Sequence, residues 1–445
     1  MRRLDPYQER SRELCLAAGV DPDSRAGEGR GQPAWCLYRD AARKEHLARE
    51  TDATKAQIAN LRPQEERFKN APLQVFGEHD EATLAQMKNC MAVGNVVSGV
   101  ICADGHLGYA QPVGGVIAYE KQISISGVGF DIGCGNMAAR LDTRFADISA
   151  TVPTIARDIA KIISFGVGRS NAERVEHTLF DDGDAWRESD MEAYRQKAVG
   201  QLGTVGSGNH YVDLMRDEDG FVWIGVHFGS RLGHTSATRY LKAAGGKDGM
   251  NVPPAVVDED SELGRRYVAA MQLAGRYAYA GREWVVERVR RIIGGSVTEC
   301  VHNHHNYAWR ETHAGRDLWV VRKGATPAFP GQKGFVGGSM GDDAVILEGI
   351  DSPEAKASLY STVHGAGRLF GRKEAKRRFS REEMDRWLNE RGVTLIGADL
   401  DESPMAYRRL PDVLAQHAGT VKVLHTLRPF AVATAGEGEF DPWKD

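Results

Sequence analysis

The chain has 445 residues, of which 42% are hydrophobic and 27% charged, and its formal net charge is −4. This length is enough for one large domain or for two or three ordinary ones. No apolar run approaches the roughly 18 residues that a membrane-spanning helix needs, so we expect no membrane partner. The mildly acidic balance gives no general attraction for nucleic acid, and any such binding would need a local basic surface.

The N-terminus and the cysteines indicate a cytoplasmic protein. Two arginines follow Met1, but no apolar signal core comes after them. The six cysteines form no CxxC pair and no disulfide-framework spacing, which fits a reducing compartment. Glycine accounts for 50 of the 445 residues, above the average of about 7%. These glycines cluster in short motifs, so we expect several loops to approach a ligand closely or to adopt positive φ angles.

Residues 1–72 differ in texture from the rest of the chain. A polar loop at 27–33 precedes a mixed-charge stretch at 39–69, which reads as helical. It could be an accessory cap, a partner-binding arm or simply a solvated helix. We expect an α/β (α+β) fold, with one large domain over 73–445 and a helical N-terminal extension over 1–72.

Within the large domain, hydrophobic periodicity and capping residues predict the elements in chain order. Predicted strands cover 96–103, 114–119, 221–225, 318–321 and 344–347. Predicted helices cover 81–91 and 263–293. A further helix begins at Pro153 and carries Ile155, Ile159, Ile162 and Ile163 on one face. Two more begin at Ser352 with Pro353 and at a capping box of Ser380 and Glu383.

The segment 129–136 (GFDIGCGN) places a carboxylate and a thiol three residues apart among glycines. In a tight turn, Asp131 and Cys134 can face one point, and a thiolate with a carboxylate and imidazoles makes a plausible transition-metal site. The alternative is that Cys134 is a buried small hydrophobe and Asp131 a turn residue. The segment alone does not decide between the two interpretations.

Four further segments place histidine at a strand end beside glycine or asparagine: 206–211 (GSGNHY), 226–231 (VHFGSR), 302–307 (HNHHNY) and 363–368 (VHGAGR). A single such histidine is more often a hydrogen-bonded structural residue, but four together favour a ligand site. In the third segment, His302 and His305 could share a helical face, whereas His304 and His305 would diverge. No closed zinc-finger spacing and no HExxH motif is present, which favours open catalytic coordination.

A glycine-rich segment and a basic run complete the pattern. The segment 334–341 (GFVGGSMG) could wrap a nucleotide through backbone N–H groups, although it lacks the lysine of a P-loop. The run 368–378 follows His364 and contains six arginines and lysines. A solvated helix face is its default interpretation, and a contact with a phosphate backbone is the functional one.

Taken in order, these segments resemble the RtcB family of RNA-splicing ligases. The matching motifs run from DGHLGY at 104–109 and DIGCG at 131–135 to HGAGR at 364–368, colinearly over about residues 72–436. The resemblance implies an RNA ligase of RNA processing, tRNA splicing or RNA repair that uses GTP and two Mn²⁺ ions. It would join a 2′,3′-cyclic phosphate or 3′-phosphate end to a 5′-hydroxyl end, through a covalent histidine–GMP intermediate and an RNA 3′-guanylate.

The same resemblance implies roles for individual residues. His364 would become linked to GMP, and Asp104 would orient it. Two metal ions would be held, one by Asp131, Cys134 and His210 and the other by Cys134, His227 and His305, with the thiolate bridging. The guanylate would be surrounded by Asn209, Asp213, Asn306, Ser339, Met340, Gly365, Ala366 and Gly367. The implied partner is RNA with such ends, and an activating protein is a further candidate.

The chain departs from the family pattern in places. It has Gly337-Gly338 where the family usually has Pro-Gly, Asp213 where a glutamate is usual, and 433–436 (ATAG) where a nucleotide-contacting lysine is usual. Cysteine and histidine ligands by themselves would favour zinc, so manganese follows from the resemblance alone. Two alternatives stay open: a metal-dependent RNA 3′-end guanylyltransferase or phosphohydrolase without efficient sealing, and an RNA-binding protein on a decayed ligase scaffold.

Overall fold

The computed structural model of the chain describes residues 8–23, 34, 38, 41–42, 45, 66–173 and 175–436. It divides into two compact units, residues 1–62 with 243–245 and residues 63–242 with 246–445. In the first unit, helix α1 (Gln8–Ala17) carries Arg10, which pairs with Glu13 and Glu45. Most of the predicted helical stretch at 39–69 lies outside the described residues, and the boundary at residue 72 stays a prediction. No described helix is long and apolar enough to cross a bilayer.

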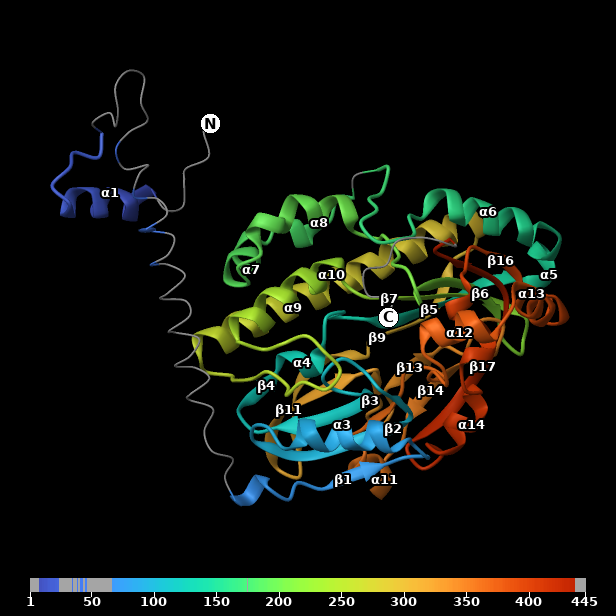
Figure 1. Cartoon of the computed structure of the whole chain (residues 1–445). Helices are drawn as coiled ribbons and strands as arrows, with labels where there is room; N and C mark the ends of the chain where they lie inside the picture. Colours follow the sequence, from blue (N-terminus) through green and yellow to red (C-terminus); the bar gives the residue numbers. More distant parts are fainter. Residues whose placement is uncertain are drawn as a thin grey trace. The chain divides into compact units, whose positions relative to one another are not determined.

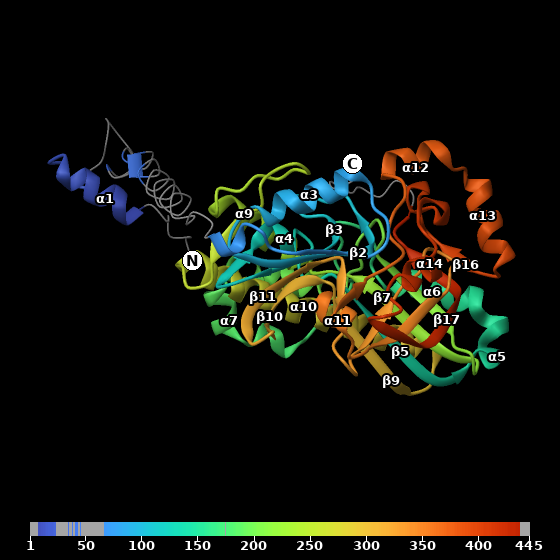
Figure 2. The ribbon, with the colours of Figure 1, turned by 90° about the horizontal axis from the view of Figure 1, so that it is seen from below.

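Two large sheets organise the second unit (Figures 1 and 2). The five-stranded sheet has the order β1 (Leu73–Val75), β2 (Val96–His106), β3 (Val113–Tyr119), β11 (Arg316–Lys323) and β10 (Asn306–His313). The eight-stranded sheet has the order β13 (Lys333–Val336), β14 (Ala344–Gly349), β17 (Val421–Thr434), β6 (Tyr211–Arg216), β7 (Phe221–Phe228), β5 (Gly135–Arg144) and β9 (Val297–His304), and β16 (Thr394–Ile396) pairs with β17. The predicted α/β (α+β) class is confirmed.

Helices α6 (Val152–Ile162) and α10 (Glu262–Ile293) lie over one face of the eight-stranded sheet (Figure 1). They bury a shared apolar core that includes Ile155, Ile159 and Val285. Burial of this kind of surface is the main favourable contribution to folding. The predicted isoleucine face is wrong at Ile162, which is 47% exposed because the helix ends there and the next residue is extended.

The helix predictions are confirmed at several ends by their caps. Helix α3 (Glu81–Met91) begins after Asp80, whose side chain accepts the N–H of Thr83. The predicted capping box opens α13 (Arg381–Glu390), and Ser352 caps α11 (Pro353–Ala357).

The strand predictions, by contrast, end too early. β2 continues to His106 and β7 to Phe228, beyond the predicted ends at 103 and 225. The extra residues include Asp104, His106 and His227, whose polar side chains break the apolar pattern. The prediction therefore fails where the candidate site begins.

Candidate active site

The predicted ligands lie together where four neighbouring strands of the eight-stranded sheet, β6, β7, β5 and β9, begin or end. β6 begins at Tyr211, which lies opposite His227 of β7. β5 begins at Gly135, which lies opposite both Phe228 of β7 and His304 of β9. This register gathers four side chains from separate segments, namely Cys134, His210, His227 and His305.

The first ligand group consists of Cys134, His227 and His305, all of which are buried. Sγ of Cys134 lies 3.3 Å from Nε2 of His227, which in turn lies 3.3 Å from Nε2 of His305. Nδ1 of His227 lies 2.9 Å from the carbonyl oxygen of Asn209. A carbonyl can only accept, so Nδ1 carries the proton and Nε2 offers its lone pair to the group. One sulfur and two imidazole nitrogens in this arrangement fit a transition-metal ion.

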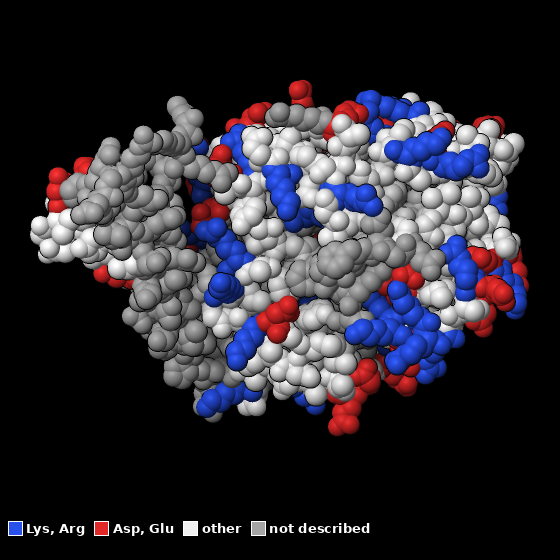
Figure 3. Space-filling view, turned by 45° about the horizontal axis from the view of Figure 1, so that its top comes forward, with Lys and Arg blue, Asp and Glu red and all other residues white. Residues whose placement is uncertain are grey.

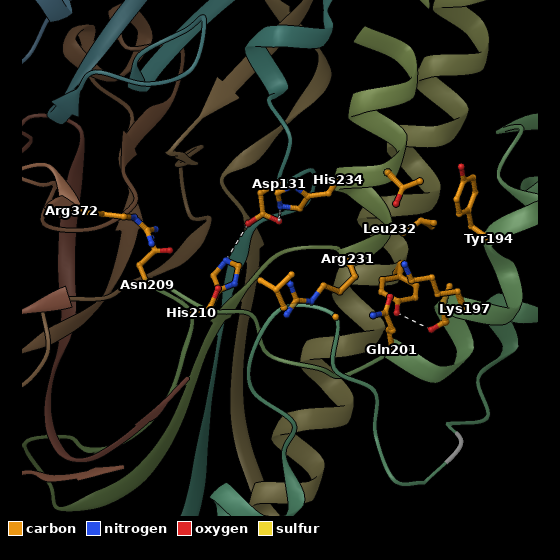
Figure 4. A pocket seen from close by; sticks show the side chains of 16 residues that line it. Asp131, Tyr194, Lys197, Gln201, Asn209, His210, Arg231, Leu232, His234 and Arg372 are labelled. Carbon is orange, nitrogen blue, oxygen red and sulfur yellow. Dashed lines mark hydrogen bonds and ion pairs between the residues drawn. The ribbon is translucent and has the colours of Figure 1, made fainter. Parts of the chain in front are cut away.

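The second ligand group consists of Asp131, Cys134 and His210. Nε2 of His210 lies 3.1 Å from Oδ2 of Asp131 and 3.6 Å from Sγ of Cys134. Cys134 is thus common to both groups, as a bridging thiolate would be. His234 adds a further imidazole, with its Nε2 3.8 Å from Oδ1 of Asp131. Figure 4 shows Asp131 between His210 and His234.

Two glycines allow these side chains to lie so close to the backbone. A Cβ atom at Gly206 would lie 2.1 Å from Nδ1 of His210, and one at Gly229 would lie 1.9 Å from Oδ1 of Asp131. A side chain at either position would therefore displace His210 or Asp131 from its place in the ligand group. This explains why the sequence motifs combine glycine with candidate ligands.

Electrostatics make the Cys134 thiol a poor acid in the metal-free protein. Burial and the neighbouring Asp131 raise the pKa of Cys134 well above its usual value. Burial also raises the pKa of Asp131, but the hydrogen bond from His210 and the charges of His210 and His234 outweigh it, so the net shift is downward. A bound cation would supply the positive charge that the thiolate lacks.

The candidate nucleophile is held by one carboxylate. Nδ1 of His364 lies 2.6 Å from Oδ2 of Asp104, and the ring of His364 lies 4.8 Å from that of His305. Asp104 is fully buried at the end of β2. Burial raises the pKa of Asp104, but the charge and hydrogen bonds of His364 outweigh it and lower the pKa overall. The carboxylate therefore stays ionised and keeps the proton of His364 on Nδ1, which leaves Nε2 as the nucleophilic atom.

All eight predicted nucleotide residues line one cleft of about 590 Å³, which also contains Cys134, His227, His305 and His364. The glycine-rich segment divides at Val336, the last residue of β13, and only 337–341 is a loop. Burial raises the pKa of Asp213 well above its usual value, and its Oδ1 has no hydrogen-bond partner among the described residues. Asn306 is already engaged, since its Oδ1 accepts the N–H of Gly324.

Comparison with known proteins identifies the family. The family model described as tRNA-splicing ligase RtcB matches residues 86–435. The chain belongs to the RtcB family.

Several relatives carry the RtcB name. The chain is 31% identical to the tRNA-splicing ligase RtcB of Thermococcus kodakarensis, in an alignment that covers 79% of this chain and 91% of that protein. It is 29% identical to the RNA-splicing ligase RtcB of Escherichia coli K12, with 74% of this chain and 88% of that protein covered. It is 31% identical to the tRNA-splicing ligase RtcB of Archaeoglobus fulgidus, with 76% of this chain and 87% of that protein covered.

In this RtcB-family chain, a second cavity of about 320 Å³ opens beside Asp131 and His210 (Figure 4). Lys197 and Arg231 line it, and Arg372 lines both this cavity and the larger cleft. The pair of ligand groups therefore lies where two cavities meet, and the second cavity carries cationic side chains.

The basic run at 368–378 is largely neutralised by neighbouring acids. Four of its six basic residues form ion pairs, namely Arg368 with Glu402, Arg372 with Asp401, Lys376 with Asp399 and Arg378 with Glu374. On the face drawn in Figure 3, lysine and arginine side chains form several separate groups. The run is therefore not a continuous basic surface.

The sequence interpretation missed three residues of this region. His234 lies one turn after Arg231 on α9 (Arg231–Ala243), and Lys323 lines the cleft with its pKa lowered by burial to about 8. Arg282 is fully buried on α10, on the same stripe as Ala278 and Val285. An arginine on an apolar helical stripe is a signal that the sequence does contain.

The cluster at 302–305 is resolved by its secondary structure. Because β9 is a strand, His302 and His304 lie on one face and both contact Arg282, whereas His305 follows the strand and joins the ligand group. The helical alternative for this segment is wrong.

Proposed function

We propose that this chain joins an RNA 3′-phosphate or 2′,3′-cyclic phosphate end to a 5′-hydroxyl end, at the expense of GTP. The observation that carries the proposal is the His364–Asp104 pair, which faces the cleft beside the Cys134–His227–His305 group. A histidine oriented by a carboxylate next to a metal-ligand cluster suits nucleophilic attack on a phosphate. Family membership supports the RNA substrate.

In the first step, Nε2 of His364 attacks the α-phosphorus of GTP. An N–P bond forms, the bond between the α-phosphorus and the bridging oxygen breaks, and pyrophosphate leaves. The imidazole keeps its Nδ1 proton throughout, and Asp104 stabilises the positive charge that develops on the ring. The backbone N–H groups of His364 and Gly365 also bind Oδ2 of Asp104, so the ring cannot swing away from the attack position.

The two ligand groups fit divalent metal ions, which we propose are manganese. Bound ions would neutralise phosphate charge and polarise the reacting oxygens. Asp131, Cys134 and His210 would hold one ion, and Cys134, His227 and His305 would hold the other. The eight predicted nucleotide residues, which include Asp213, all line the cleft and would surround the guanylate.

The later steps transfer the guanylyl group and seal the strands. A 3′-phosphate oxygen of the RNA attacks the phosphorus on His364, which breaks the N–P bond and forms an RNA 3′-guanylate. The 5′-hydroxyl of the second strand then attacks the 3′-phosphorus, loses its proton and displaces GMP. A 2′,3′-cyclic phosphate is first opened by water to the 3′-phosphate. The cavity lined by Lys197 and Arg231 supports an RNA substrate, because cationic side chains beside the ligand groups suit an RNA backbone.

The test uses labelled RNA with defined ends. With GTP and Mn²⁺, we expect joining of a 3′-phosphate end to a 5′-hydroxyl end, and no joining of a 3′-hydroxyl end to a 5′-phosphate end. Accumulation of the RNA 3′-guanylate without joined product would favour the guanylyltransferase alternative. Removal of the 3′-phosphate without any guanylate would favour the phosphohydrolase, and RNA binding without either reaction would favour a decayed scaffold.

A further inference from the structure

Arg282 lies behind the ligand groups, and its side chain is fully buried. It projects from α10 and donates to three acceptors: the carbonyl oxygen of Phe228 at 2.6 Å, that of Gly133 at 2.9 Å, and Nε2 of His302 at 2.9 Å. Its Nη2 also lies 3.0 Å from Nδ1 of His304. Within the described part of the chain, the guanidinium forms no ion pair with a carboxylate.

Each of these contacts is close in the chain to one member of the first ligand group. Gly133 precedes Cys134, Phe228 follows His227, and His304 precedes His305. The three segments come from the turn before β5, the end of β7 and the end of β9. Backbone hydrogen bonds already join the turn to both strand ends, from the N–H of His305 to the carbonyl oxygen of Cys134 and from the N–H of Ser230 to that of Ile132, and the guanidinium adds a side-chain link to all three. The planar guanidinium spans them because its N–H groups point in several fixed directions.

We propose that Arg282 is the positioning residue of the Cys134–His227–His305 group, and that it acts on this group and not on the Asp131–His210 side. This inference rests on the metal sites of the proposed function. The asymmetry follows from the contacts, since Arg282 bonds beside both His227 and His305, which belong to this group alone, whereas its one contact near the other group is the carbonyl oxygen of Gly133 beside the shared Cys134.

A role in core packing alone would not explain an arginine here. The neighbouring positions of its stripe, Ala274, Ala278, Val285 and Val289, are apolar. Burying a charge costs free energy unless hydrogen bonds or an opposite charge offset the loss of water. An apolar residue of similar length would fill the same space without that cost. Burial lowers the pKa of Arg282 to about 10, so the guanidinium stays charged at neutral pH.

The experiment compares Arg282→Met and Arg282→Lys with the wild type in the full chain. Arg282→Met removes all donors, whereas Arg282→Lys keeps the charge on one nitrogen that cannot span the three segments. Arg276→Met is the matched control, because Arg276 lies on the same helix, is half exposed and pairs with Asp182. Mn²⁺ bound per chain is counted by elemental analysis, and the affinities are obtained by titration.

We expect the wild type and the Arg276→Met variant to bind two ions. In both Arg282 variants, one ion should bind at least tenfold more weakly, as is typical when a partner of a ligand is lost, while the other keeps most of its affinity. Co²⁺ provides a second readout, because the sulfur-to-metal absorption of Cys134 should weaken in the Arg282 variants and not in the control.

Unchanged affinity for both ions, or an equal loss of both, would overturn the inference while leaving the proposed function intact. Failure of both variants to fold, judged by circular dichroism, would also overturn it, because Arg282 would then serve the fold alone. A wild type that binds no pair of ions would instead refute the metal sites of the proposed function.

Discussion

Oδ2 of Asp104 lies 2.6 Å from Nδ1 of His364 and accepts the backbone N–H groups of His364 and Gly365 as well. One carboxylate oxygen thus fixes both the ring and the backbone of the candidate nucleophile. Asp104 is at the end of β2 in the five-stranded sheet, and His364 follows β15 (Ser361–Val363). The pair therefore depends on contacts between segments that lie 260 residues apart.

The first prediction concerns the charge of this carboxylate. Asp104→Asn keeps an oxygen for the backbone N–H groups but removes the charge that stabilises the modified ring. We expect the rate of GMP attachment to fall by roughly 100-fold or more. Stopped reactions with labelled GTP measure this rate. The matched control is Asp158→Asn on α6, where the carboxylate is partly exposed and pairs with Lys161, and a wild-type rate in Asp104→Asn would contradict the assigned role.

A second prediction concerns the shared thiol. Cys134→Ser should weaken both metal ions, since the sulfur belongs to both ligand groups and a serine hydroxyl is not ionised at neutral pH. Elemental analysis after dialysis should find less than one ion per chain. Cys300→Ser is the control, because Cys300 is exposed and free. Retention of two tightly bound ions in Cys134→Ser would exclude a bridging role.

The second cavity leads to a prediction about RNA. Lys197 is an exposed residue of α8 (Arg195–Gln201) that lines this cavity, so Lys197→Ala should weaken binding of the RNA strand. The plot of the logarithm of the RNA-binding constant against the logarithm of the salt concentration should become less steep by about 1, as expected for the loss of one phosphate contact. GMP attachment should not change. Lys161→Ala on α6 serves as the control, and a loss of GMP attachment in Lys197→Ala would contradict the assignment.

Asp213 leads to a prediction about the nucleotide. Its buried Oδ1 has no hydrogen-bond partner among the described residues and lines the proposed guanylate site. The N1–H and N2–H groups of a bound guanine would stabilise the ionised carboxylate that accepts them, whereas N1 of an adenine is an acceptor and gives no such stabilisation. Asp213→Ala should lower kcat/KM for GTP at least tenfold and change that for ATP little. An equal fall for both nucleotides would show that Asp213 supports the fold and does not select the base.

A pH prediction follows from His417, which supports the strand of Asp104. Nε2 of His417 accepts the N–H of Ala103, and Nδ1 lies 3.1 Å from Oγ1 of Thr420. Burial lowers the pKa of His417 to about 4, against about 6.5 in the unfolded chain. The stabilisation is therefore complete above pH 6.5 and is lost as the pH falls towards 4, because the unfolded chain takes up the proton first.

Urea unfolding of the wild type and of His417→Gln measures this effect. Glutamine can accept from Ala103 and donate to Thr420 but does not titrate. Between pH 7.5 and pH 4.5 the wild type should lose about 2 to 3 kcal/mol more unfolding free energy than the variant. Parallel pH profiles would show that His417 is not neutral in the folded protein.

The sequence predicted the local elements better than the contacts between them. Helix α3 was predicted at both ends from its amphipathic pattern, and the capping box of Ser380 and Glu383 predicted the start of α13. Strand ends were missed at β2 and β7, since hydrophobic alternation stops where Asp104 and His227 replace apolar residues. Local patterns do not encode which strand ends meet, so the pairing of β5 with both β7 and β9 required the structure.

The candidate site was predicted residue by residue from a family resemblance, and the family is confirmed. The residues that the sequence interpretation missed contact the site through residues that are distant from them in the sequence. Arg282 lies on a helix over 140 residues from Gly133, with which it bonds, and nothing in the spacing of the motifs connects them. His234 is close in sequence to Arg231, but its relation to Asp131 depends on the packing of α9 against the turn before β5.

Attachment of GMP to His364 is the step on which the proposed ligase reaction depends. The full-length protein is incubated with GTP and Mn²⁺, and its mass is measured before and after digestion. The account predicts the addition of one GMP, located on the peptide that contains His364, and no adduct in His364→Ala. An adduct that persists in His364→Ala, or a wild type with no adduct under these conditions, would contradict it.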